Sequence, residues 1–180
     1  MSQSIEFNLD GEVVTAEPGE TIWKVAQRHG TSIPHLCYAD EPGYRADGNC
    51  RACMVEIDGE RTLAASCIRT PSPGMTVNTN TDRARTSRKV VFEMLMADQP
   101  AREQAHEHDS KFWQWSDQIE LTASRMPARE APVADSSHPA MRVQLDACIQ
   151  CNLCVRACRE VQVNDVIGMA YRGSQSQIVF

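Results

Sequence analysis

The stretch Gly48-Asn49-Cys50-Arg51-Ala52-Cys53 places two cysteines two residues apart in a segment without helix or strand periodicity. Single cysteines flank it at positions 37 and 67, which gives the spacing Cys37-x12-Cys50-x2-Cys53-x13-Cys67. Four thiolates can hold a two-iron, two-sulfide cluster where the backbone approaches the sulfur atoms closely, and the small residues of this stretch allow such an approach. The four cysteines of this first block are therefore predicted to bind a 2Fe–2S cluster.

The segments around the first block predict a small mixed domain. Residues 5–15 alternate between apolar and polar side chains around Asp10-Gly11, a pattern that indicates a β-hairpin with a two-residue turn. Thr21 is a candidate N-cap for a short helix that ends near His29. Residues 54–67 predict a second hairpin, with strands at 54–57 and 61–67. A hairpin, a helix, a cysteine loop and a second hairpin favour an α+β fold with a β-grasp 2Fe–2S ferredoxin domain.

A basic helix is predicted to follow this domain. Apolar residues recur at three- and four-residue steps from Ala84 to Leu95, and Pro100 ends the run. Four basic residues lie on the same helix: Arg83, Arg85, Arg88 and Lys89. We interpret them as a solvated face, with docking of an acidic partner as the alternative.

The second cysteine block has the compact spacing Cys148-x2-Cys151-x2-Cys154-x3-Cys158, which is that of bacterial ferredoxins and predicts a 4Fe–4S cluster. Cys158 is expected to begin a short helix. In two-cluster ferredoxins the fourth cysteine of such a run binds the other cluster, and this sequence contains no second motif. Either Cys158 completes the local cluster, or a later cysteine of a longer polypeptide does. The strand-like residues 178–180 at the end favour a fragment of a longer chain.

Three segments are therefore expected. Residues 1–80 would form the plant-type 2Fe–2S domain, 81–138 a helix and connector, and 139–180 part of a bacterial-type 4Fe–4S ferredoxin-like domain. The connector is poor in periodicity but contains three aromatic residues, Phe112, Trp113 and Trp115, which we expect to pack it onto a neighbouring element.

Composition and sequence pattern argue against several classes of function. The net charge of −6 and the lack of a basic cluster with interleaved aromatics argue against a nucleic-acid partner. No run approaches the roughly 18 apolar residues of a spanning helix, and no signal peptide is visible, so no membrane association and a cytoplasmic location are expected. In a reducing compartment, cysteines at this spacing favour metal binding over disulfides. Structural zinc, in an interaction module without a redox role, is the alternative.

No catalytic site is predicted within the chain. Ser66, Asp40, Glu41 and Asp47 are interpreted as exposed loop residues, since such residue types favour loops. No glycine-rich signature for binding a dinucleotide or a phosphate occurs, so flavin and NAD would belong to partners. His35, two residues before Cys37, is expected to be a packing or hydrogen-bonding neighbour rather than a ligand.

Two stretches carry a family resemblance. Residues 33–38 and 48–56 resemble the amino-terminal domain shared by three systems: the large subunit of NADH-quinone oxidoreductase (complex I), the diaphorase part of NAD-reducing hydrogenases, and the α subunit of soluble NAD-dependent formate dehydrogenases. Residues 145–168, which include the second block, look most like the formate dehydrogenase α subunit. The resemblance covers nearly the whole chain except the connector.

The resemblance implies an electron-transfer segment of an oxidoreductase that converts formate and NAD to CO2 and NADH. The molybdenum or tungsten site with its molybdopterin would lie elsewhere in the α subunit, and a partner subunit would carry FMN and bind NAD. A hydrogenase or complex I parent is the alternative. In much of that family one histidine and three cysteines hold a further 4Fe–4S cluster, whereas residues 98–121 here contain no cysteine. We expect that cluster to be absent and His106 and His108 to be exposed loop residues.

Overall fold

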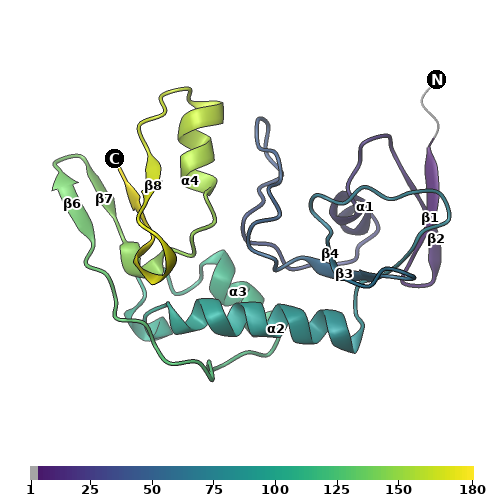
Figure 1. Ribbon diagram of the computed structural model, residues 1–180, viewed down its shortest axis with the longest axis horizontal. Helices are drawn as coiled ribbons and strands as arrows, with labels where there is room; N and C mark the ends of the chain where they lie inside the picture. Colours follow the sequence, from purple (N-terminus) through teal and green to yellow (C-terminus); the bar gives the residue numbers. More distant parts are fainter. Residues whose placement is uncertain (1–3) are drawn as a thin grey trace. The chain divides into compact units, whose positions relative to one another are not determined.

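The computed structural model describes residues 4–180 (Figure 1), so residues 1–3 of the predicted first domain lie outside the described part of the chain. Two compact units can be distinguished. Unit 1 comprises Met1–Tyr38 and Arg45–Val90, and unit 2 comprises Ala39–Tyr44 and Val91–Phe180. Helix α2 (Asp82–Ala97) begins in unit 1 and ends in unit 2. In residues 4–180, no helix has both the length and the apolar character that crossing a membrane requires.

Unit 1 is built on a five-stranded sheet in the order β2-β1-β5-β3-β4. Its strands are β1 (Ile5–Leu9), β2 (Glu12–Ala16), β3 (Met54–Ile57), β4 (Ala64–Ala65) and β5 (Thr76–Asn78). Strand β1 runs antiparallel to β2 and parallel to β5, while β3 runs antiparallel to both of its neighbours. Together with helix α1 (Ile22–Arg28) this mixed sheet confirms the α+β class with a β-grasp arrangement.

The first hairpin forms as the sequence predicts. Asp10 and Gly11 have φ values of 52° and 93°, and a two-residue turn of the hairpin type needs positive φ at both positions. Asn8 also accepts a hydrogen bond on Oδ1 from the Gly11 N–H at 2.8 Å. The turn fixes the register, so that Phe7 pairs with Val14 across the hairpin.

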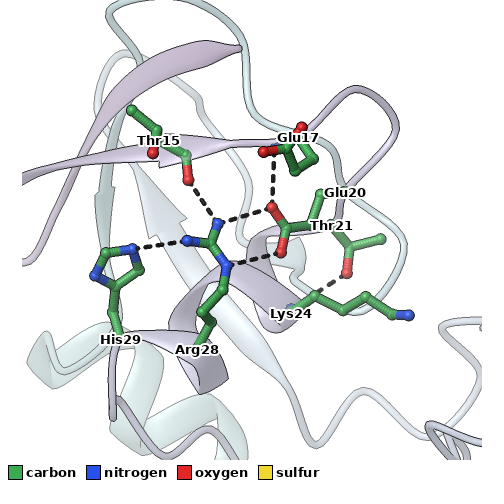
Figure 2. Close-up of polar contacts among 7 residues, drawn as sticks. All are labelled: Thr15, Glu17, Glu20, Thr21, Lys24, Arg28 and His29. Carbon is green, nitrogen blue, oxygen red and sulfur yellow. Dashed lines mark hydrogen bonds and ion pairs between the residues drawn. The ribbon is translucent and has the colours of Figure 1, made fainter.

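Helix α1 is capped and then tied to the edge of the sheet (Figure 2). The Thr21 hydroxyl accepts a hydrogen bond from the Lys24 N–H at 3.4 Å, as expected of an N-cap. At the other end, Arg28 Nη2 donates to the Thr15 carbonyl at 2.6 Å and to Glu20 Oε2 at 2.9 Å. Burial alone would raise the pKa of Glu20, but the hydrogen bond and the charge of Arg28 outweigh it, and the pKa is lowered from its usual value.

The core of unit 1 lies between the sheet and α1. It contains sixteen buried residues, among them Phe7 of β1, Ile22 of α1 and Val55 of β3, and these three side chains are at most 2% exposed. Cys53 and Cys67 belong to the same core. Apolar burial of this kind is the dominant favourable contribution to folding, so the sheet and helix fix the positions of these two cysteines.

Strand β4 is shorter than predicted, and the strand expected over residues 61–67 is wrong beyond Ala64–Ala65. The backbone turns after Ala65, whose carbonyl accepts hydrogen bonds from the N–H groups of Ile68 and Arg69 at 3.2 and 3.1 Å. Because these bonds run along the chain rather than across it, the ladder with β3 stops. The turn directs Cys67 back into the core.

The prediction of a solvated basic face on α2 is wrong at one position. Arg83 pairs with Glu56 at 3.0 Å and Arg85 pairs with Asp82, and both arginine side chains are about half exposed. Arg88, in contrast, is only 7% exposed. Its guanidinium binds main-chain carbonyl oxygens of unit 1, which the spacing of basic residues along a helix could not indicate.

Unit 2 combines short helices with two small hairpins (Figure 1). Its elements after α2 are η1 (Arg102–Gln104), α3 (Lys111–Gln118), β6 (Asp135–His138), β7 (Met141–Val143), η2 (Leu145–Ala147), α4 (Leu153–Arg156), the π-helical turn η3 (Ala157–Val161), β8 (Gly168–Ala170), η4 (Gly173–Gln175) and β9 (Gln177–Val179). Strands β6 and β7 pair antiparallel, as do β8 and β9. Helix α3 interrupts what the sequence predicts to be an irregular connector.

Aromatic packing holds α3 in place. Phe112 stacks on Phe92 of α2 with ring centroids 5.7 Å apart, and Trp113 packs edge-on against Phe112 at 5.0 Å. Both Phe112 and Trp113 are buried, which confirms the packing role expected for them. Arg102 lies 5.6 Å from the Trp113 ring centroid and pairs with Asp117, so the segment before α3 is also fixed.

Candidate iron–sulfur site

The first cysteine block lies entirely in unit 1. Cys37 follows the buried segment after α1, Cys50 and Cys53 lie in the loop that leads into β3, and Cys67 lies in the turn after β4. Three of the four thiols are 1% exposed, and Cys50 is half-buried. Cys37 and Cys67, which are 30 positions apart in sequence, are thus both buried in unit 1.

The four thiols are arranged as two pairs. A hydrogen bond joins the side chains of Cys37 and Cys50 and lowers the pKa of Cys50 to about 7, and the same interaction, together with burial, raises the pKa of Cys37. In the other pair, the hydrogen bond from Cys67 lowers the pKa of Cys53 to about 7. One thiolate per pair is therefore favoured near neutral pH, and thiolates are the form that binds metal. The eight cysteines, all within residues 4–180, form no disulfide.

Main-chain N–H groups point at the sulfur atoms of the first pair. The Cys50 N–H donates to Cys37 Sγ at 3.3 Å, and the Ala52 N–H donates to Cys50 Sγ at 3.5 Å. The loop reaches this geometry through positive φ at Gly48 (62°) and Arg51 (59°). A Cβ atom on Gly48 would lie 2.7 Å from Ile68 Cδ1, so glycine allows the loop to pack against the turn that carries Cys67.

Ser66 is a site residue that the sequence reasoning missed. It was expected in an exposed loop, but its side chain is fully buried in the turn beside Cys67. Its hydroxyl donates to the Cys53 carbonyl at 2.8 Å, its N–H donates to the same oxygen at 3.1 Å, and the hydroxyl also helps to lower the pKa of the Cys53 thiol. The adjacent cysteine was the only sequence signal for this role.

His35 packs beside the block, as expected. Its Nδ1 lies 3.3 Å from the Ile33 carbonyl oxygen, and its ring meets Trp23 edge-on at 4.6 Å. Trp23 also meets Tyr38 edge-on at 5.0 Å and donates from Nε1 to the Ile33 carbonyl. This aromatic group fixes the segment that delivers Cys37.

The second block lies in unit 2 and is more open. Cys158 is buried, Cys148 and Cys151 are half-buried, and Cys154 is exposed. The helix of this block begins at Leu153 and continues as a π-helical turn through Cys158, so the expectation that it begins at Cys158 is wrong. Burial raises the pKa of Cys154, and the charges of Cys148 and Cys158 raise it further.

Main-chain N–H groups also donate hydrogen bonds to cysteine sulfur atoms in the second block. The Gln150 N–H donates to Cys148 Sγ at 3.4 Å, and the Val166 N–H donates to Cys158 Sγ at 3.3 Å. Positive φ at Gln150 (53°) and Asn152 (61°) bends the chain around the block. Within residues 4–180, no three histidine, cysteine or acidic side chains lie close enough together to hold a single metal ion. His106 and His108 are exposed loop residues, as predicted.

Comparison with known proteins agrees with the arrangement of the first block. Residues 2–82 match the 2Fe-2S iron-sulfur cluster binding domain family. A chain from the crystal structure of an NAD+-reducing NiFe-hydrogenase in the H2-reduced state superposes with a TM-score of 0.84 at 30% sequence identity, over 98% of this chain and 74% of that one. Residues 2–82 of the chain belong to this 2Fe–2S domain family.

Sequence relatives of this family member come from two kinds of oxidoreductase. The mitochondrial NADH-ubiquinone oxidoreductase 78 kDa subunit of Candida albicans is 28% identical over 97% of this chain and 25% of its own length. The NADP-reducing hydrogenase subunit HndD of Solidesulfovibrio fructosivorans is 30% identical over 94% of this chain and 30% of its own length. The chain thus spans about a quarter to a third of the length of these curated relatives.

Proposed function

We propose that this chain is an iron–sulfur electron-transfer segment of a soluble, cytoplasmic, NAD-dependent formate dehydrogenase. The observation that carries the electron-transfer role is the burial of Cys37, Cys53 and Cys67 in unit 1, with main-chain N–H donors to Cys37 and to the half-buried Cys50. The thiols interact as Cys37 with Cys50 and Cys53 with Cys67. A 2Fe–2S cluster contains two irons, and two thiolates on each complete its set of four cysteines. The donor set and its pairing fit this cluster.

In this proposal Cys37 and Cys50 would hold one iron, and Cys53 and Cys67 would hold the other. When bound, the cluster supplies reversible one-electron chemistry. The Cys50 and Ala52 N–H groups stabilise negative charge on sulfur, as does the hydroxyl of Ser66. The sheet and α1 exclude water from three of the four thiols, which limits loss of the metal.

The second block is proposed to hold a 4Fe–4S cluster through Cys148, Cys151, Cys154 and Cys158. The bacterial ferredoxin spacing supports this, as do the N–H donors to Cys148 and Cys158. Under this proposal residues 1–80, 81–138 and 139–180 are respectively the 2Fe–2S domain, the helix and connector, and a partial 4Fe–4S domain. No residue of the chain is assigned a catalytic role.

The formate dehydrogenase parent is supported by the resemblance of residues 145–168 alone. A flavin- and NAD-binding subunit would be the partner, and molybdopterin would lie outside these 180 residues. A second candidate, a subunit of an NAD-reducing hydrogenase, is favoured by the superposition on the hydrogenase chain.

Metal and sulfide analysis of the purified chain tests the electron-transfer role. After anaerobic reconstitution we expect iron with acid-labile sulfide, a visible absorption that dithionite bleaches, and an EPR signal of a reduced 2Fe–2S cluster. The matched control is the variant Cys37→Ala/Cys67→Ala, which removes one thiol from each pair. Stoichiometric zinc without sulfide would instead support the zinc-stabilised interaction module.

Isolation of the native complex through a tag on this chain tests the parent. Molybdenum or tungsten, FMN and formate-dependent reduction of NAD are expected for a formate dehydrogenase. Nickel with hydrogen-dependent reduction of NAD would assign the chain to a hydrogenase and would leave the electron-transfer role intact.

A further inference from the structure

We propose that Arg88 is a positioning residue that sets the reduction potential of the first cluster, by holding a buried positive charge beside Cys53. The inference rests on the proposed 2Fe–2S function of the first block and extends it to a residue on α2. Its basis is the placement of the guanidinium against the strand that leaves the cysteine loop.

Hydrogen bonds fix the guanidinium in one orientation. Nε and Nη2 both donate to the Met54 carbonyl, at 2.9 and 2.7 Å, and Nη2 also donates to the Thr79 carbonyl at 2.6 Å. Met54 is the residue directly after Cys53 and the first residue of β3. Arg88 therefore joins α2 to the start of β3 and to the end of β5, close to the Cys53 ligand.

The charge is buried without a directly bonded carboxylate. The three hydrogen bonds end on neutral carbonyl oxygens, and the side chain is 7% exposed. Burial lowers the pKa of Arg88, while the negative charge of Cys53 and, to a smaller extent, that of Asp10 acts in the opposite direction. An arginine nevertheless stays protonated in proteins. The thiolate of Cys53 is thus the leading negative charge acting on this cation.

A fixed cation acts more strongly on the reduced cluster than on the oxidised cluster, because reduction adds one negative charge. In a low-dielectric interior this interaction is screened less than at the surface. Arg88 is therefore expected to favour reduction and to raise the potential. Arg83 and Arg85 lie on the same helix but are about half exposed and paired with carboxylates, so water and their partners screen them.

A purely structural role would give a different result. If Arg88 only tied α2 to β3, its loss would lower stability and leave the potential unchanged. Lysine keeps the charge but not the planar fork that binds two carbonyls, so Arg88→Lys separates the two roles. Asp10→Asn provides a test of opposite sign, since it removes a negative charge that counters Arg88. Asparagine also tolerates the positive φ of 52° at this position.

The experiment is EPR-monitored redox titration of the reconstituted full chain, with iron and sulfide content and circular dichroism measured on each variant. Arg88→Gln is expected to lower the equilibrium constant for one-electron reduction about tenfold, which corresponds to about 59 mV. For Arg88→Lys, this equilibrium constant should stay within about threefold of the wild-type value. For Asp10→Asn, it should rise only about twofold, because the interactions of an exposed charge are screened. The matched control Arg85→Gln removes an exposed charge from the same helix and should change it less than twofold.

The outcomes separate this inference from the proposed function. If the wild type takes up no iron and sulfide, both are wrong. If Arg88→Gln retains its cluster at the wild-type potential, only the role of Arg88 is overturned. If Arg88→Gln cannot retain a cluster, the neutral variant Arg88→Met decides: a lowered potential supports the inference, and an unchanged one contradicts it.

Discussion

The two cysteine blocks reach comparable sets of four thiols by different physical means. The first is rooted in a core of sixteen buried residues, which includes two of its own cysteines. The second rests on a core of three buried residues, Leu145, Val155 and Ile178, and one of its thiols is exposed. The difference predicts that the first site is assembled by the fold, whereas the order of the second would depend on the cluster proposed for it.

The backbone shows the same contrast. Cys53 and Cys67 share the core that the sheet and α1 build, and the loop beside them has positive φ at Gly48 and Arg51. Around the second block the chain bends locally, with positive φ at Gln150, Asn152 and Val163. For a β-branched residue such as Val163 this conformation is costly, and such strain persists only where the surroundings enforce it. Four metal–thiolate bonds are a means of enforcing it.

Loss of one ligand from each block gives the largest expected effect. Cys53→Ala should abolish the 2Fe–2S EPR signal, because one iron then keeps a single protein thiolate. Cys154→Ala should leave that signal intact and remove the signal assigned to the 4Fe–4S cluster. The measurement is EPR with iron quantitation on both variants. Loss of the 2Fe–2S signal in Cys154→Ala would contradict the independence of the blocks.

Removal of iron with a chelator should affect the two regions unequally. In the apoprotein, amides of β1, β3 and β5 are expected to exchange at least about a hundredfold more slowly than those of residues 148–166, because core strands open only at high free-energy cost. Hydrogen exchange followed by mass spectrometry measures this directly. Equal protection in both regions would show that the second block is also assembled without metal.

A matched pair of valines sharpens the contrast. Val55→Ala should lower the free energy of unfolding of the apoprotein by about 2 kcal/mol, through lost burial and the resulting cavity. Val155→Ala, also a buried position, should change it by less than about 0.5 kcal/mol if its region is already disordered without metal. Urea unfolding followed by far-UV circular dichroism gives both values. A cost near 2 kcal/mol for Val155→Ala would indicate a metal-independent core in unit 2.

The smallest effect is expected at Glu20, whose pKa is lowered in the folded chain from 4.5. The stability that the pairing of Glu20 with Arg28 contributes is fully present above the pKa of Glu20 in the unfolded chain. It is lost as the pH falls through the lower pKa of Glu20 in the folded chain. Glu20→Gln should therefore cost about 0.5–1 kcal/mol at pH 7 and almost nothing near pH 3. Thermal unfolding of the apoprotein at the two pH values tests this, with Glu17→Gln as a control for general surface charge. A cost independent of pH would assign the effect to packing.

The sequence was most informative where local chemistry determines the structure. The Asp10-Gly11 turn, the Thr21 cap and the start of β3 follow from turn, cap and alternation signals. The cysteine spacing likewise predicted a four-thiol site, and this stays a prediction. Helix α3 was missed because its stability comes from tertiary contacts, above all the stacking of Phe112 on Phe92, which are not visible in a two-turn segment.

Two of the incorrect interpretations near the first block have a common cause. Arg88 and Ser66 belong to residue types that usually lie at the surface, and both are buried. Each donates a hydrogen bond to a main-chain carbonyl at or next to Cys53. Ser66 donates to the carbonyl of Cys53 itself, and Arg88 donates to the carbonyl of Met54. Such partners are set by how β3, β4 and α2 pack, and sequence spacing carries no signal for them.

The contact between Arg28 and the Thr15 carbonyl has a consequence for self-association. Strand β2 is an outer strand of the five-stranded sheet, and exposed strand edges offer templates for aggregation. Any incoming strand that sought the Thr15 oxygen would first have to displace a guanidinium that also pairs with Glu20. Arg28, at the end of α1, thus protects part of the exposed edge of β2 from pairing with another strand. The apolar Val13 of the same hairpin can therefore stay exposed to solvent.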